Sequence, residues 1–234
     1  IAQQNLNRLT PYGQKCTSFA TRLTLLPTQL KRIRENPVNF ISFTPATTFD
    51  LKSQGGIAEE RALIYRMLAG SLRLHGRGLA RALQGGCTQS GWDWWLRHWS
   101  AHIDHDLATG FLAEVAADAR LRADLARVCD ELADGRRRVS PETRQLAWDV
   151  IGRLRQTLAH VCIGSLEPDL VILDEFQRFR HLLEGESDAA LLARSLMDYT
   201  SREGLEARVL MLSATPYRMF TLTTDANDDH YRDL

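Results

Sequence analysis

The sequence predicts an α/β protein in which a parallel sheet with flanking helices is interrupted by a large all-α insertion. Two apolar runs of strand length, 170–173 and 209–212, stand on either side of a helical pattern that Ser187 can cap. Both runs are continuously apolar, as expected of strands that are buried on both faces of a parallel sheet. Between residues 57 and 163, apolar residues recur with helical spacing instead.

Each predicted element has its own signal along the chain. Residues 1–9 have the pattern of a short amphipathic helix, and the runs 19–26 and 38–43 are apolar enough for strands. The last helix of the insertion is expected to begin at Ser140-Pro141, a cap residue followed by a proline at the first helical position. These patterns divide the chain into a first sheet segment at 1–56, a helical insertion at 57–164 and a second sheet segment at 165–234.

The composition is that of an ordinary globular protein. The chain has 234 residues, 44% of them hydrophobic and 25% charged, and its formal net charge is zero. Zero net charge gives no overall attraction to nucleic acid, although a local basic groove would be enough for binding. The four cysteines form no CxxC pair, which favours reduced thiols over a zinc site or a disulfide framework.

Hydropathy and the first residue give two further expectations, one about location and one about the extent of the chain. No run of 18 apolar residues is present, so we expect no membrane association and a cytoplasmic location. Because the chain begins at Ile1 rather than at Met, we interpret it as an excerpt from a longer protein.

Two short polar motifs follow the two apolar runs. Asp174 and Glu175 come directly after the first run, and Ser213 and Thr215 come directly after the second. In open α/β sheets, ligands bind at the carboxyl ends of the strands, so the four side chains are candidates for one site. The alternative for the acids is a strand end that turns into solvent, and for the hydroxyls a Ser/Thr/Pro turn.

Taken together, Asp174-Glu175-Phe176-Gln177 and Ser213-Ala214-Thr215 resemble motif II (the DExx box) and motif III (the SAT box) of superfamily 2 helicases and translocases. The resemblance implies a first RecA-like ATPase lobe, similar to those of bacterial defence-type DEAD/DEAH-like helicases. It also implies ATP and Mg²⁺ as cofactors.

The same resemblance assigns roles to these residues. Asp174 would hold the Mg²⁺ and, with Glu175, contact the nucleotide, while Glu175 would activate the attacking water. Gln177 stands where the family more often has Asp or His, and it would belong to the catalytic box and couple hydrolysis to movement. Ser213 and Thr215 would connect the nucleotide site with the nucleic-acid groove.

Two further segments resemble nucleic-acid contacts of the same family. Thr44-Pro45 follows the predicted strand 38–43 and is similar to motif Ib, where a capped helix start can hold a phosphate. A plain strand-to-helix turn is the alternative. Gln4 to Arg8 loosely resembles motif Ia. Both would contact the backbone of a nucleic acid, DNA more than RNA.

The glycine-rich phosphate loop, GxxxxGK[ST], does not occur in the sequence. The order of the family's motifs would place it before Ile1, and the second ATPase lobe after Leu234. We therefore expect the chain alone to be inactive.

Two side-chain clusters within the predicted insertion have alternative interpretations. His98, His102 and His105 have a helical spacing that suits zinc, but a solvated helix face is the default. A set of four tryptophans could stack on bases, whereas three of them share a helical face that favours core packing: Trp92, Trp95 and Trp99, with Trp94 outside that face.

The function that these observations favour is ATP hydrolysis that drives movement along nucleic acid. One alternative is a non-catalytic, ATPase-derived scaffold whose helical insertion binds a protein partner. The other is the motor part of a restriction-type nuclease.

Overall fold

The computed structural model describes residues 16–43, 55–98, 103–134, 139–174, 185–201 and 203–212. The first segment contains β1 (Cys16–Ala20), the 3-10 helix η1 (Leu23–Thr28), α2 (Leu30–Arg34) and β2 (Val38–Ser42). Helices α4 (Ala58–Leu68), α5 (Gly76–Gln84), α6 (Gln89–His98), α7 (His105–Ala117), α8 (Ala119–Ala133) and α9 (Pro141–Leu166) follow. The last segment contains β3 (Leu170–Asp174), α11 (Asp188–Met197) and β4 (Arg208–Leu212).

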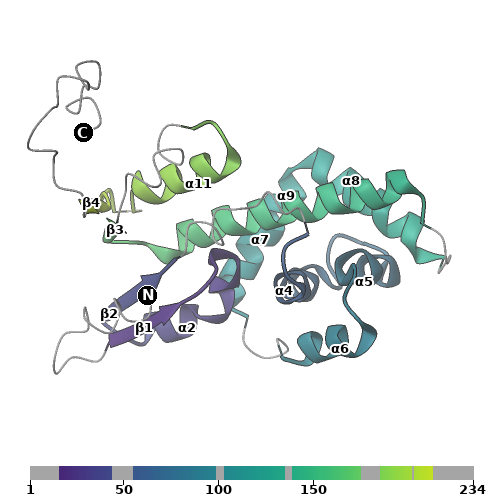
Figure 1. Ribbon diagram of the computed structural model, residues 1–234, viewed down its shortest axis with the longest axis horizontal. Helices are drawn as coiled ribbons and strands as arrows, with labels where there is room; N and C mark the ends of the chain where they lie inside the picture. Colours follow the sequence, from purple (N-terminus) through teal and green to yellow (C-terminus); the bar gives the residue numbers. More distant parts are fainter. Residues whose placement is uncertain are drawn as a thin grey trace, which may run out of the picture.

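The predicted fold class is wrong. The described residues are mostly helical, and their strands form two separate two-stranded parallel pairs, β1–β2 and β3–β4, instead of one RecA-like sheet (Figure 1). The strand β4 is not buried on both faces, since Val209, Leu210, Met211 and Leu212 are all exposed. A continuously apolar run shows that a strand can be buried, but it contains no information about the layers that would cover it.

The helices of the middle segment surround the hydrophobic core. The long helix α9, of 26 residues, contacts α7, α8 and η1 and leads into β3 (Figure 1). Buried apolar side chains come from every helix from α4 to α9, and α6 contributes Trp92 at 2% exposure. The helical periodicity between residues 57 and 163 therefore predicted the local structure of the described residues.

The core also includes residues from the two flanking segments. Leu23, Leu26 and Leu30 of η1 and α2 are at most 1% exposed and belong to the same cluster as the helical residues. Val171 of β3 and Leu192 of α11 join this cluster from the other side. The core thus crosses both of the boundaries predicted at 56/57 and 164/165, and the division into domains remains a prediction.

Several local signals are confirmed at the helix ends. Ser140 Oγ accepts a hydrogen bond from Thr143 N–H at 3.0 Å, with Pro141 as the first helical residue of α9. Ser187 Oγ accepts from Ala190 N–H at 3.2 Å and caps α11. The strand predicted at 19–26 is only partly correct, because β1 ends at Ala20 and η1 follows. The helix predicted over 1–9 lies outside the described residues. None of the described helices has the length and apolar character needed to cross a membrane.

Candidate functional site

The candidate site lies at the carboxyl ends of β3 and β4. These strands are parallel, and their register sets Val171 opposite Val209 and Asp174 opposite Leu212. Asp174 is the last residue of β3 and its side chain is exposed. The residues that follow in the sequence, Glu175 and Ser213, therefore leave two adjacent strands at the same end. This register is what a shared site for the two motifs requires.

Of the predicted site residues, Asp174 alone lies within the described part of the chain. The other eight lie outside the described residues: Glu175, Gln177, Ser213, Thr215, Thr44, Pro45, Gln4 and Arg8. Thr44 follows β2 after one intervening residue, so the candidate motif Ib follows a strand of the other pair. The structure therefore pairs the strands that precede the DExx-like and SAT-like segments, while the strand before the candidate motif Ib belongs to a separate sheet.

The strand β3 follows closely after α9, and α11 packs against that helix. Glu167 ends α9 in the left-handed conformation with φ of 47°, and the chain then turns into β3. Arg208 N–H donates to Asp169 O at 3.0 Å and starts the β3–β4 pairing. Val171, 8% exposed, points into the core, and α11 packs against α9. Asp174 thus stands at the end of a short strand whose other end is anchored in the helical core.

The carboxylate of Asp174 is the kind of ligand that Mg²⁺ prefers, since the ion binds hard oxygen donors and keeps several waters. An exposed carboxylate at a strand end leaves room for such waters. Asp174 therefore fits the role of a magnesium ligand, with Glu175 next in the chain as the second acid.

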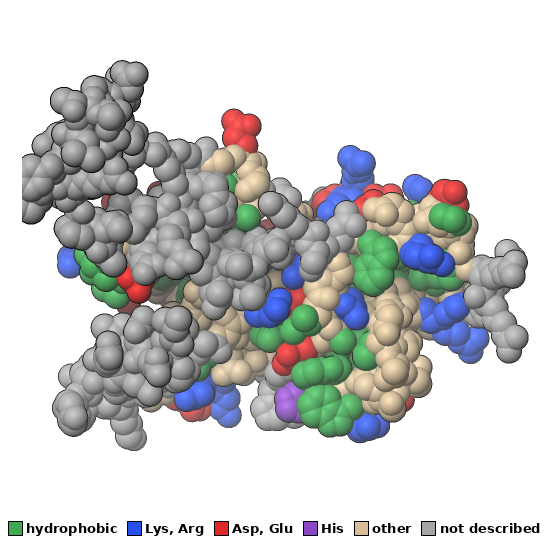
Figure 2. Space-filling view, in the orientation of Figure 1, with side chains coloured by type: hydrophobic (Ala, Val, Ile, Leu, Met, Phe, Trp, Pro, Cys, Tyr) green, Lys and Arg blue, Asp and Glu red, His purple; other side chains and the backbone are tan. Residues whose placement is uncertain are grey.

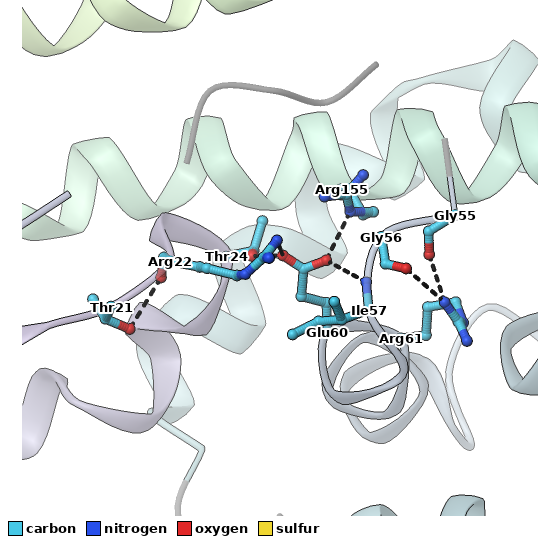
Figure 3. Close-up of polar contacts among 9 residues, drawn as sticks. All are labelled: Thr21, Arg22, Thr24, Gly55, Gly56, Ile57, Glu60, Arg61 and Arg155. Atoms are coloured by element: carbon cyan, nitrogen blue, oxygen red, sulfur yellow. Dashed lines mark hydrogen bonds and ion pairs between the residues drawn. The ribbon is translucent and has the colours of Figure 1, made fainter. Parts of the chain in front are cut away.

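A buried polar cluster joins α9 to the first segment (Figure 3). Glu60 of α4 accepts hydrogen bonds from Arg155 Nε at 3.1 Å, Thr24 Oγ1 at 2.7 Å and Ile57 N–H at 3.0 Å. Arg22 Nη1 lies 3.5 Å from the same carboxylate. The side chains of Glu60 and Arg155 are each 1% exposed. One carboxylate thus connects α4, α9, η1 and the residue before η1.

Arg61, beside Glu60 in sequence, organises a second set of contacts. Its guanidinium donates to Gly55 O at 2.7 Å and Gly56 O at 3.0 Å (Figure 3). It also donates to Leu83 O at 2.7 Å. Burial lowers the pKa of Arg61, while Cys87 and Glu60 act in the opposite direction. These bonds satisfy carbonyl groups at the end of α5 and before α4, where no helical partner is available.

This polar cluster could not be found from local spacing. Glu60 and Arg155 are 95 residues apart in sequence, and each occupies a position in an ordinary amphipathic helix. The signal that exists is the pair Gly55-Gly56, because Gly56 has φ of 52° and a Cβ there would overlap Glu60 and Arg155.

The histidine and tryptophan clusters have different outcomes. His98 and His105 are exposed, His102 lies outside the described residues, and no group of three metal-binding side chains occurs within the described ranges. Trp92 is 2% exposed and packs edge-on against Tyr65, so core packing is confirmed for it. Trp94, by contrast, is 51% exposed, and sequence reasoning gave it no separate role.

Comparison with known proteins gives no match to a protein-family model, to a curated protein or to a solved structure.

Proposed function

We propose that this chain is part of an ATP-dependent nucleic-acid helicase or translocase of the cytoplasm, acting on DNA more than on RNA. The observation that carries the proposal is the parallel register of β3 and β4, with Asp174 opposite Leu212. Because of this register, the DExx-like segment and the SAT-like segment begin at the same end of one strand pair.

The chemistry follows from the residue types. Asp174, with its exposed carboxylate, would hold Mg²⁺, which neutralises charge on the phosphates of bound ATP. Glu175 would accept a proton from the attacking water, the usual work of a positioned carboxylate. Ser213 and Thr215 follow the neighbouring strand. Through hydrogen bonds of their hydroxyl groups, and together with Gln177, they would couple ATP hydrolysis to the nucleic-acid groove.

The test is the substitution Glu175→Gln in the protein that contains this chain. The amide keeps the size of the side chain and loses the base, so Mg-ATP binding should persist while kcat falls by at least about a hundredfold. The matched control is Glu186→Gln, an exposed carboxylate in the same connection between β3 and α11, which should leave kcat unchanged.

Near-normal hydrolysis by Glu175→Gln would reject Glu175 as the base. Absence of hydrolysis in the unsubstituted protein, with nucleic acid present, would favour the scaffold alternative. Cleavage of DNA that depends on ATP would favour the motor of a restriction-type nuclease.

A further inference from the structure

Helix α6 carries an aromatic group that the strand-end site does not use, in which two side chains are exposed and one is half-buried. We call Trp94, Trp95 and His98 the α6 aromatic patch. The rings of Trp94 and His98 are stacked, with centroids 5.0 Å apart and planes 14° apart. Trp95 meets Trp94 edge-on at 4.5 Å. Figure 2 shows a histidine side chain beside exposed hydrophobic side chains over α6.

The patch adjoins the contact that fixes α6 to the core. Trp92, at 2% exposure, makes that contact together with half-buried Trp95. Trp94 follows two positions later, about 200° around a helix, and therefore points away from the core. It remains 51% exposed although His98 and Trp95 already pack against it. Single exposed apolar residues are common, but a contiguous exposed aromatic group is typical of a binding surface.

Two arginines lie at the carboxyl end of α6. Arg66 of α4 donates to Leu96 O from Nε at 2.9 Å and also from Nη2, so its guanidinium lies at the carboxyl end of α6. Arg97 and His98 are exposed in the same turn. A flat aromatic face with guanidinium groups beside it is complementary to a base and the phosphates that flank it.

The acidic side chains nearby oppose this charge only partly. Asp93 accepts a hydrogen bond from Gln89 Nε2 at 2.8 Å, one turn away on the same helix. Glu59 of α4 is close enough to His98 to interact with it electrostatically. Burial raises the pKa of Glu59, while the charge of His98 acts in the opposite direction.

We propose that the α6 aromatic patch binds single-stranded nucleic acid, with one base stacked on Trp94 and the adjoining phosphates near Arg66 and Arg97. The patch would be a second contact, on the helical segment and apart from the strand-end site. This inference deepens the proposed function by adding a place where an unpaired strand is held. It does not depend on ATP or on Glu175.

The test is a titration of the protein into a fluorescently labelled oligothymidylate of about 15 nucleotides, a length within the range of known single-strand sites. Binding is followed by fluorescence anisotropy without ATP. Trp94→Ala should raise the Kd about tenfold, since one base–aromatic stack is lost. Trp94→Phe should retain most of the affinity because phenylalanine also stacks. Leu205→Ala removes an apolar side chain of 65% exposure elsewhere and should change nothing.

Circular dichroism of each variant separates loss of binding from loss of folding. If folded Trp94→Ala binds as tightly as the unsubstituted protein, the inference is overturned. A protein partner would then be the alternative ligand of the patch. If the unsubstituted protein does not bind the oligonucleotide, the inference is also overturned. Neither result bears on the Glu175→Gln experiment, and failure of that experiment would leave the Trp94 result unchanged.

Discussion

Arg155 of α9 and Glu60 of α4 form an ion pair with 3.1 Å between Nε and Oε2, and both side chains are 1% exposed. Removing two charges from water is costly, and their attraction offsets that cost only when the remaining polar atoms are also bonded. Here Thr24 and Ile57 supply the other hydrogen bonds to the carboxylate. Loss of either partner would therefore leave the other buried charge without this ion pair.

Glu60→Gln should therefore destabilise the protein by about 3 kcal/mol, the usual cost of breaking a buried ion pair by removing one partner. The free energy of unfolding in urea measures the effect. Glu59→Gln is the matched control, since this neighbouring carboxylate is only partly buried, and it should change stability by less than about 0.5 kcal/mol. Equal effects of the two substitutions would contradict the importance of the pair.

At Gly78, helix α5 lies directly against the backbone of α8. A Cβ at this position would overlap the backbone carbonyl group of Cys129, which cannot rotate away as a side chain can. Gly78→Ala should therefore force the helices apart and cost about 2 kcal/mol. Gly76→Ala on the same helix meets nothing within 4 Å and should change stability by less than about 1 kcal/mol. Thermal unfolding of the two variants checks this, and a stable Gly78→Ala would contradict the close crossing.

Asp118 should make stability depend on pH in acid. Its carboxylate caps α8 by accepting from Leu121 N–H at 2.8 Å, and this bond, followed by the contact with Arg153, lowers its pKa from 3.8. Because the pKa is lowered in the folded state, the stabilisation by the Asp118 carboxylate is complete above pH 3.8. It is lost as the pH falls below this value. Asp118→Ala should cost about 1 kcal/mol at pH 7. The difference from the unsubstituted protein should shrink toward pH 3.

The control for this prediction is Asp118→Asn, because asparagine also caps helices but does not titrate. Its stability should show less loss between pH 5 and pH 3 than that of the unsubstituted protein, measured by urea unfolding at each pH. A constant difference across this range would show that the carboxylate charge contributes nothing.

The buried cysteines should be unreactive in the folded protein. Burial raises the pKa of Cys129 to about 12 and that of Cys162 well above 9, so neither forms the reactive thiolate at neutral pH. In a Cys16→Ser background, a thiol reagent at pH 8 should label Cys87, which is partly exposed, and should label the other two only after unfolding. Rapid labelling of Cys129 in the native protein would contradict its burial.

The same thiols predict an alkaline limit of stability. An unfolded thiol ionises near 9, whereas Cys129 in the folded protein stays protonated to about 12. Burial of the protonated thiol therefore costs no ionisation energy below pH 9. The folded state loses stability relative to the unfolded state as the pH rises from 9 toward 12. Cys129→Ala should flatten the decline, as followed by urea unfolding between pH 8 and pH 10.

Local signals predicted local structure well. The caps Ser140 and Ser187 and the strand ends at Asp174 and Leu212 lie where spacing and side-chain chemistry indicated. The run 19–26 was misinterpreted in part, although Leu23, Leu26 and Leu30 have the three- and four-residue spacing of a helical face. The apolar content of this run favours a strand, whereas the spacing of its leucines favours a helix, and the spacing is the signal that agrees with the structure.

Long-range structure was the part that the sequence did not reveal. The arrangement of strands into two separate pairs depends on which layers cover each strand, and an apolar run such as 209–212 is compatible with either arrangement. The Glu60–Arg155 pair and the exposure of Trp94 depend on helix packing. No spacing rule within one helix distinguishes a charge that meets a distant partner from a charge that meets solvent.

The separation of Glu60 and Arg155 by 95 residues also has a consequence for synthesis of the chain. Glu60 leaves the ribosome long before Arg155, and a carboxylate is too costly to bury without its fully buried cationic partner. Helix α4 therefore cannot complete its final packing until α9 has been made. The order of translation thus delays closure of the core until late in synthesis, and release of a chain that ends before residue 155 should yield a species recognised by chaperones.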